Sequence, residues 1–290
     1  MAVVQQPTVV AVFGVCMAAM QGASLCDVTS YGAKNDGRTR STTAIHDAIQ
    51  ACAKAGGGTV YFPARTYETA AIELASNIVL NIDAGATLRF HTDLSEYPLV
   101  PGRSEGTEGL TPAPLIGGRN LQNVTVAGRG TLTTDNAAWV RAMNNPEARA
   151  MWTSIQNRLE NKEKVPEADY RKAALSLRPS FIRPMDSKNI LIEGIHIIGS
   201  SMWVIHLLYC ENVVVRNVMV ETYPSANGDG IDIDSSREVH VSDSYFDTGD
   251  DAIVLKSGKG VDGRRVGRTT ENVTITNSTF RRAYGRRDRQ

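Results

Sequence analysis

The chain has 290 residues, of which 42% are hydrophobic and 21% are charged, and its 31 Lys and Arg residues balance its 31 Asp and Glu residues. This composition excludes a disordered chain and allows one sizeable core. A formal net charge of zero gives no overall field that would attract nucleic acid or an anionic membrane, so we expect neither as a partner. We expect the folded chain to be a monomer that recognises its ligand through local sites.

The first 24 residues have the composition of an export signal. No charged residue precedes Asp27, and residues 9–20 form an unbroken run of small and apolar residues. This run is too short to cross a bilayer, while Gly22 and Ser24 have the spacing that a signal peptidase accepts. We therefore predict a signal peptide over residues 1–24 and a secreted or periplasmic protein. A misread start is the alternative, because the first eight residues contain no Lys or Arg.

Removal of this segment would leave three cysteines in the chain. They are Cys26, Cys52 and Cys210, an odd number without a C-x-x-C spacing. We therefore expect neither a disulfide framework nor a zinc site.

Residues 41–55 are predicted to form an amphipathic helix. Five small or apolar residues fall on one stripe at helical spacing, namely Ala44, Ile45, Ala48, Ile49 and Cys52. The three glycines at 56–58 follow this helix and precede a strand, whereas a phosphate-binding loop needs the opposite order. We expect them to end the helix and turn the chain.

From residue 77 onward the sequence repeats a short pattern. An Asn or its substitute precedes a strand of alternating aliphatic and polar residues at Asn77, Asn123, Asn189, Asn212, Glu238 and Asn272. The last three steps are 23, 26 and 34 residues, which is the period of a solenoid coil with variable loops. Short strands at this period predict an all-β fold, a right-handed parallel β-helix that forms one domain over residues 25–290. The N-x-S/T sequons at Asn123, Asn272 and Asn277 are then interpreted as turn asparagines.

Two helical segments fit this architecture. An open first coil would expose its apolar core and its strand edges, so we expect the helix at 41–55 to cap the amino-terminal end. Residues 137–178 break the repeat with a polar helical sequence that carries Trp152, Ile155 and Leu159 on one side. We predict an inserted helical loop that covers part of one face, with a domain linker as the alternative.

Carboxylates gather at two places on the predicted coils. Asp229 precedes the pair Asp250 and Asp251 by 21 and 22 residues, close to one coil. The two places should therefore lie side by side, roughly 5 Å apart along the solenoid axis. Neighbouring glycines can bend the chain so that these carboxylates point outward, and the strand alternation places Asp232 and Asp234 on the same outer side.

Clustered carboxylates allow three interpretations. They repel one another, which raises at least one pKa and keeps a proton near neutral pH, so that one group can act as a general acid. Hydrolysis of a glycosidic bond with inversion uses such an acid and a water-activating carboxylate about 6.5 to 9.5 Å away. A calcium site, as in a polysaccharide lyase, is the second interpretation, since hard cations take several oxygen ligands. An Asp-rich turn set without chemistry is the third.

Several stretches resemble one enzyme family. They are "RPSFI" from residue 178, "GSSMWVIHLLYCENVVVRNV" from 199, "NGDGIDIDSS" from 227 and "GDDAIVLKSG" from 249. Together with "VTSYGAKNDG" from residue 28 and "GGGTVYFPARTY" from 56, they are similar to glycoside hydrolase family 28. This family comprises the polygalacturonases and related pectinases, and the similarity is to its bacterial branch. The resemblance extends from Cys26 to Phe280.

The resemblance implies roles for three aspartates. The family's Asn-Thr-Asp-Gly and Gly-Asp-Asp motifs fall on residues 227–230 and 249–251. By this resemblance Asp250 protonates the glycosidic oxygen, while Asp229 and Asp251 activate the attacking water, with inversion.

Other polar residues near the motifs are candidates for binding substrate. Asn227 opens the first motif, Asp232 follows it, and Lys256 offers a positive charge to an anionic sugar chain. Three further cations are candidates with a solvated loop as the alternative, namely Lys259, Arg264 and Arg265. Three histidines in strand repeats away from the motifs are expected to be structural, namely His196, His206 and His240.

The sequence departs from the family pattern in two places. Gly228 stands where the family has threonine, which we expect to loosen the bend. The family's later Gly-His-Gly and Arg-Ile-Lys motifs are missing and the chain ends in "RRAYGRRDRQ", so we interpret it as truncated at the C-terminus, with low activity or solubility. Because the codons of Gly285–Gln290 permit Gly-Val-Val-Ile-Gly-Ser in another frame, we hypothesise a frameshift, with a true basic tail as the alternative.

The expected function is hydrolysis of galacturonan-type pectic polysaccharide without a metal or other cofactor. Two alternatives remain open at this point. One is a calcium-dependent pectate lyase of similar fold, and the other is a carbohydrate-binding fragment without turnover.

Overall fold

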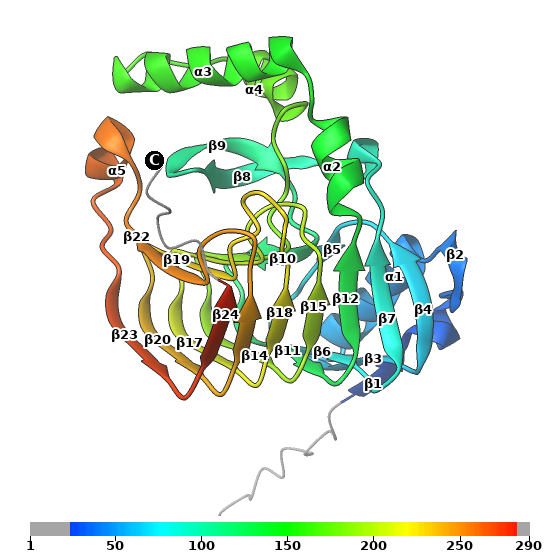
Figure 1. The fold of residues 1–290 in the computed structure, drawn as a ribbon. Helices are drawn as coiled ribbons and strands as arrows, with labels where there is room; N and C mark the ends of the chain where they lie inside the picture. Colours follow the sequence, from blue (N-terminus) through cyan, green and yellow to red (C-terminus); the bar gives the residue numbers. More distant parts are fainter. Residues whose placement is uncertain (1–23, 283–290) are drawn as a thin grey trace, which may run out of the picture.

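The computed structural model describes residues 24–282 as three long parallel sheets wound around one core (Figure 1). The six coils between the first and the last described one each add one strand to each sheet, so the predicted right-handed parallel β-helix is confirmed. The predicted signal peptide, apart from Ser24, lies outside the described residues. So do Gly285–Gln290, on which the frameshift hypothesis rests.

Sheet A runs along one side of the solenoid and contains eight strands. In spatial order they are β1 (Ser24–Asp27), β3 (Gly58–Phe62), β6 (Ile78–Ile82), β11 (Gln122–Gly128), β14 (Lys188–Glu193), β17 (Glu211–Arg216), β20 (Arg237–Ser242) and β23 (Glu271–Thr276). Alternate residues point inward and stack on their partners in the next coil. One such stack is aliphatic and buried in six successive coils, at Val60, Leu80, Val126, Ile192, Val215 and Val241.

A ladder of side chains explains the repeated asparagine at the start of these strands. The backbone φ lies between 53° and 62° at all six repeat positions, a left-handed conformation that Asn adopts more readily than most residues. Asn123 donates to Asn77 at 2.9 Å, Asn189 to Asn123 at 2.9 Å and Asn212 to Asn189 at 2.8 Å. The interpretation of these residues as turn asparagines is therefore confirmed.

Sheets B and C complete the three faces. Sheet B contains β2 (Asp36–Arg40), β4 (Arg65–Thr69), β7 (Ala86–Phe90), β12 (Thr131–Thr134), β15 (His196–Ile198), β18 (Met219–Glu221), β21 (Tyr245–Asp247) and β24 (Thr279–Arg282). Sheet C contains β5 (Ile72–Glu73), β10 (Ile116–Arg119), β13 (Ile182–Met185), β16 (Ile205–Leu208), β19 (Ile231–Asp234) and β22 (Ile253–Lys256). The site described below lies on the outer side of sheet C.

Helix α1 (Thr42–Lys54) covers the first coil, as the sequence predicts. Its residues Ile45, Ile49 and Cys52 are fully buried against the core. The glycines at 56–58 follow with φ values of 92°, 127° and 155°, which only glycine adopts without strain. They end the helix and bring the chain into β3.

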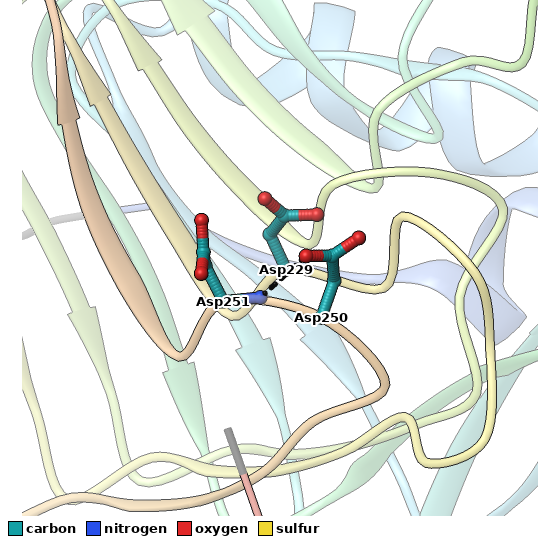
Figure 2. A group of neighbouring side chains, drawn as sticks. All are labelled: Asp229, Asp250 and Asp251. Carbon is teal, nitrogen blue, oxygen red and sulfur yellow. Dashed lines mark hydrogen bonds between the residues drawn. The ribbon is translucent and has the colours of Figure 1, made fainter. Parts of the chain in front are cut away.

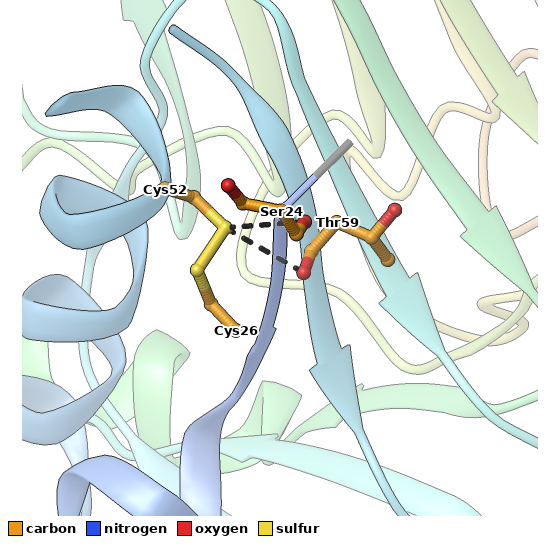
Figure 3. Close-up of a disulfide and its surroundings, with 4 residues drawn as sticks. All are labelled: Ser24, Cys26, Cys52 and Thr59. Atoms are coloured by element: carbon orange, nitrogen blue, oxygen red, sulfur yellow. Dashed lines mark hydrogen bonds between the residues drawn. A yellow bond between two sulfur atoms is a disulfide. The ribbon is translucent and has the colours of Figure 1, made fainter. Parts of the chain in front are cut away.

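A disulfide joins Cys26 on β1 to Cys52 on α1, so the expectation of no disulfide is wrong (Figure 3). The two Cα atoms lie 6.1 Å apart, a separation that a disulfide spans. The spacing of the two cysteines in the sequence did not indicate this pair, because they are 26 residues apart and meet only when α1 packs over β1. Cys210 is free and buried.

Two insertions stand over the outer side of sheet C (Figure 1). The first is an antiparallel hairpin of β8 (Leu99–Ser104) and β9 (Thr107–Pro112). The second contains α2 (Asn136–Ala142), α3 (Pro146–Glu160) and α4 (Glu167–Ala174), and so begins one residue before the predicted segment 137–178. Trp152 and Ile155 of α3 are buried against α4 in a small core of their own.

Three short helical elements complete the described chain. They are the 3₁₀ turns η1 (Val28–Tyr31) and η2 (Leu94–Glu96), and helix α5 (Gly260–Val266) beside the hairpin. None of the helices between residues 24 and 282 is both long and apolar enough to cross a membrane.

Candidate active site

Three aspartates meet where two neighbouring strands of sheet C begin. Asp229 lies two residues before β19, and Asp250 and Asp251 lie just before β22. Ile231 pairs with Ile253 in register, so Asp229 and Asp251 occupy equivalent places on adjacent coils. One carboxylate oxygen of each aspartate lies within 4.8 Å of the others. Figure 2 shows the three carboxyl groups pointing to the same side of the segments that carry them.

Close packing of glycines bends the chain at this point. A Cβ atom at Gly249 would lie 2.1 Å from the Ser225 carbonyl oxygen, and one at Gly228 would lie 2.8 Å from the same atom. A side chain at Gly249 would therefore clash with the preceding coil, and one at Gly228 would clash with its own loop. The Gly228 carbonyl accepts a 2.5 Å hydrogen bond from Thr222, and the expectation that glycine loosens the bend stays a prediction.

Burial raises the pKa of the cluster, so that it keeps a proton near neutral pH. Asp229 is only 3% exposed, and its Oδ1 has no hydrogen-bond partner among the described residues. Burial, opposed by the charge of Lys256 and reinforced by Asp250 and Asp251, raises the pKa of Asp229 to about 7. Burial and the adjacent Asp250 also raise the pKa of Asp251. The predicted retention of a proton agrees with these shifts.

The three carboxylates lie as close together as the coil spacing in the sequence predicts. One oxygen of each aspartate lies within 4.8 Å of the others, in line with the roughly 5 Å step between neighbouring strands. The physical reason is that Asp229 and Asp251 stack directly on adjacent coils.

Asp232 lies on the outer side of β19 but is fully buried, so its expected role in binding substrate from an open groove is not supported. Lys256 Nζ donates to it at 2.5 Å, and burial together with the charge of Asp229 raises its pKa well above the ordinary value. The same ammonium lies 3.8 Å from Asp229 Oδ2 and 3.5 Å from the centroid of the Trp203 ring. Lys256 is thus held between two carboxylates and an aromatic face.

Asp234 is also buried, beneath the hairpin. Its Oδ1 accepts from Arg103 of β8 at 2.7 Å, and neither side chain is exposed. Burial raises the pKa of Asp234, but the His206 ring, whose Nε2 lies 3.5 Å from Asp234 Oδ2, and Arg103 outweigh it, so that the pKa lies below its ordinary value. Asp234 therefore anchors the hairpin to sheet C.

Two residues near the cluster were not assigned a role from the sequence. Arg178 donates to Asn227 Oδ1 at 2.5 Å and to the Ala226 carbonyl at 2.9 Å, so it reaches the loop that carries Asp229. Trp203 precedes β16 and contacts Lys256 as described. Both lie in stretches that resemble the family, "RPSFI" and "GSSMW", which is the only signal that could have indicated them.

The sequence led us to expect His206 away from the motifs, but it lies beside them. It pairs in register with Asp232. It is fully buried, its ring lies 5.0 Å from that of Trp203, and burial lowers its pKa. His196 lies on sheet B and contacts Glu221 at 2.6 Å, and His240 lies on sheet A. These two positions are distant from the cluster along the coil.

The more distant cations have structural contacts. The Lys259 amide donates to the Gly106 carbonyl at 3.1 Å, and Arg265 contacts Glu108 and Asp262 at 2.5 and 2.7 Å. These bonds hold α5 against the tip of the hairpin. Arg264 is exposed, which agrees with the alternative of a solvated loop.

The aspartate cluster offers oxygen ligands to a cation as well as to a sugar. Three carboxylates within 4.8 Å would suit calcium in charge and type. However, the Lys256 ammonium 3.8 Å from Asp229 already supplies positive charge there and would repel a divalent ion. The arrangement favours acid–base chemistry over metal binding.

Comparisons with known proteins provide independent evidence. Residues 52–285 match the sequence profile of Glycosyl hydrolases family 28. An exo-poly-α-D-galacturonosidase from Dickeya chrysanthemi is 28% identical over 282 residues, covering 89% of this chain and 46% of that protein. A probable polygalacturonase from Vitis vinifera is 27% identical over 267 residues, covering 89% of this chain and 48% of that protein.

A solved structure shows the same architecture. The hyperthermoactive exopolygalacturonase from Thermotoga maritima superposes with a TM-score of 0.79 at 30% identity, covering 90% of this chain and 66% of that one. The present chain spans about half the length of the two curated relatives. Because the family profile matches most of the sequence and the fold agrees, this chain belongs to glycosyl hydrolases family 28.

Proposed function

We propose that this chain hydrolyses galacturonan-type pectic polysaccharides by acid–base catalysis without a cofactor. The observation that carries the proposal is the cluster of Asp229, Asp250 and Asp251, whose oxygens lie within 4.8 Å and one of whose members has a pKa of about 7. Such a cluster supplies both a proton donor and a proton acceptor near neutral pH. Membership of the family supports the same reaction class.

In the proposed reaction Asp250 gives its proton to the glycosidic oxygen as that bond breaks. Asp229 and Asp251 accept a proton from the water that attacks the anomeric carbon, so one proton is consumed and one is released. The Asp251 amide donates to one Asp250 oxygen at 3.0 Å, which leaves the other oxygen for the substrate. Carboxylates this close share a bound proton, and the reactive form is the one in which Asp250 carries it.

Inversion is the stereochemistry that we propose. Two carboxylates on neighbouring coils can hold one water between them, which a single displacement requires. A covalent intermediate would need only one nucleophilic carboxylate and would preserve the configuration. Proton NMR of the first sugar released distinguishes the two, because inversion gives the anomer opposite to the linkage in the substrate.

Export to the periplasm or the medium forms part of the proposal. The predicted signal peptide supports it, and so does the Cys26–Cys52 disulfide, because disulfides persist mainly in oxidising compartments.

The test is release of reducing ends from polygalacturonate with a chelator present. We expect Asp250→Asn to lower the rate by about 100-fold or more, the usual contribution of a general acid. Asp47→Asn, which changes an exposed aspartate on α1, is the matched control and should retain full activity.

Other outcomes would point to the alternative functions. Products with ultraviolet-absorbing unsaturated ends, formed only with calcium, would identify a lyase. Binding of oligogalacturonate without any cleavage would identify a carbohydrate-binding protein. Equal activity of Asp250→Asn and the unmodified chain would remove Asp250 from the mechanism.

A further inference from the structure

Asp232 has no part in the proposed reaction, yet it is buried beside the aspartate cluster. Its side chain is fully buried, and its Oδ2 atom has no hydrogen-bond partner among the described residues. Its Oδ1 atom accepts from Lys256 Nζ at 2.5 Å. A buried carboxylate with an unsatisfied oxygen destabilises a fold. The presence of Asp232 at this place therefore needs an explanation other than stability.

Lys256 bonds to Asp232 although its register partner is another aspartate. In the pairing of β19 with β22, Lys256 lies opposite Asp234. Asp234 is already engaged, because its Oδ1 accepts from Arg103 at 2.7 Å and its Oδ2 lies 3.5 Å from His206 Nε2. The Lys256 ammonium turns instead to Asp232, two residues nearer to the beginning of β19, where the cluster lies.

The ammonium is held close to Asp229 but is not bonded to it. Its Nζ lies 2.5 Å from Asp232 Oδ1, 3.5 Å from the centroid of the Trp203 ring and 3.8 Å from Asp229 Oδ2. The distance to Asp232 is that of a charge-assisted hydrogen bond, whereas 3.8 Å is too long for one. Lys256 thus favours a negative charge on Asp229 without occupying its oxygen.

Other charged groups around Asp229 do not replace this ammonium. Asp250 and Asp251 lie within 4.8 Å and, when ionised, raise the pKa of Asp229. Arg178 lies farther off and is bonded to the loop before Asp229. Facing Asp232 from β16 is His206, whose pKa burial lowers, so its ring is neutral at pH 7. Among the described residues, only Lys256 has a cationic nitrogen within 4.0 Å of an Asp229 oxygen.

We propose that Asp232 is a positioning residue, which holds the Lys256 ammonium beside Asp229 but out of hydrogen-bond contact with it. Asp229 then keeps an oxygen free to accept the proton of the attacking water. Without the charge of Asp232, the ammonium would bond to Asp229, the other carboxylate within its reach. This inference rests on the proposed function, since it explains how the base of the same reaction is kept available.

Titration of the Asp229 carboxyl group tests the inference without turnover. Carbon-13 NMR follows the carboxyl groups of labelled aspartates, and Asp229→Asn identifies the signal. Asp232→Asn keeps the shape of the side chain but removes its charge, so the ionisation constant of Asp229 should rise about tenfold as the ammonium approaches. Lys256→Met removes the ammonium and should lower that constant about tenfold or more. The two variants thus act in opposite directions.

An ion pair on sheet A supplies matched controls. Lys188 Nζ lies 2.7 Å from Glu211 Oε2, and Glu211→Gln and Lys188→Met should both leave the titration of Asp229 unchanged. In the Lys256→Met background, Asp232→Asn should have little further effect, because Asp232 acts through the ammonium.

A crystal structure of Asp232→Asn shows where the ammonium goes. We expect Lys256 Nζ within about 3.2 Å of an Asp229 oxygen, the range of a hydrogen bond. An ammonium that stays at its present place, or a titration of Asp229 that Asp232→Asn does not change, would overturn the inference.

The pH dependence of polygalacturonate hydrolysis gives a second readout. The rate falls at low pH as the base Asp229 takes up a proton. Asp232→Asn should move this fall to lower pH and also decrease the maximal rate, because the ammonium then occupies the base. Lys256→Met should move the fall to higher pH. A merely structural role of Asp232 would decrease the rate without moving the fall.

The results separate this inference from the proposed function. Hydrolysis that loses its maximal rate in Asp232→Asn at an unchanged pH dependence would overturn the positioning role and leave hydrolysis established. Opposite shifts of the Asp229 titration in a chain that releases no reducing ends would support the positioning role and overturn the proposed function.

Discussion

Asp229 combines deep burial with a place among other carboxylates. A free aspartate ionises near pH 3.8, but burial raises the pKa of Asp229 to about 7. The folded chain therefore keeps this proton over a pH range in which the unfolded chain has lost it. Stability from this group is fully present below pH 3.8 and is lost as the pH rises toward and through 7.

Asp229→Asn should therefore stabilise the fold in neutral and alkaline solution. The difference between 3.8 and about 7 corresponds to at most about 4 kcal/mol at pH 8, a figure that already includes the attraction of Lys256. At pH 4 the variant and the unmodified chain should have similar melting temperatures. Thermal unfolding at both pH values, with Asp47→Asn as control, checks this. A stabilisation that is the same at pH 4 and pH 8 would show that ionisation of Asp229 is not its cause.

At the scale of elements, α1 and β1 are joined covalently at the cap. The disulfide between Cys26 and Cys52 closes a loop with a sequence separation of 26 residues. Restricting a loop of this length in the unfolded chain stabilises the fold by roughly 3 to 4 kcal/mol in the chain-entropy model.

Removing both sulfurs tests this contribution. The double variant Cys26→Ser and Cys52→Ser should unfold at a lower denaturant concentration, with an unchanged far-ultraviolet spectrum. A reducing agent should lower the stability of the unmodified chain but not that of the double variant. Stability of the unmodified chain that is insensitive to reduction would contradict a formed disulfide.

Regular elements were predictable from the sequence where the signal is local. Alternation and the recurring asparagine indicate sheet A, and the apolar stripe at 41–55 indicates the cap. The hairpin at 99–112 and the disulfide were not predictable, because each depends on segments that meet only after the coils have stacked.

In the candidate site too, only the features with a local or periodic signal were predictable from the sequence. The spacing of Asp229 from Asp250 and Asp251 indicates their meeting, since it is close to one coil. The burial of Asp232 could not be read from alternation, which identifies an outer side but not the Lys256 side chain that bonds to it there. Arg178 lies 51 residues before Asp229 in the sequence, and no periodic pattern connects them.

At the scale of the whole molecule, the two ends of the described solenoid differ. The first coil is covered by α1, whereas the last described coil exposes inward-type residues. Leu255, Ile275 and Phe280 are 54%, 40% and 47% exposed, and they lie on the outermost strands of the three sheets. The sequence predicts a monomer, but exposed apolar strands of this kind favour association.

We therefore expect the mass of this chain in solution to increase with concentration. Ile275→Lys should shift the distribution toward the monomer, because a charge on an edge strand opposes pairing with another chain. Light scattering coupled to size-exclusion chromatography measures both effects, and Ile198→Lys is the control, since Ile198 is similarly exposed on sheet B away from the last coil. A single mass at all concentrations would support the monomer instead.

The hairpin changes how the solenoid should come apart. In a simple repeat protein each coil contacts only its neighbours, so coils can unfold one by one from an open end. Here the hairpin leaves the chain before β10, yet its Gly106 carbonyl accepts a bond from Lys259, 153 positions later. Fraying of the last coils would have to break this bond and the ion pair between Glu108 and Arg265. The hairpin thus couples early and late coils into one cooperative unit. We expect the backbone amides of sheet C to exchange their hydrogens at similar rates in its early and late strands, because these strands open together.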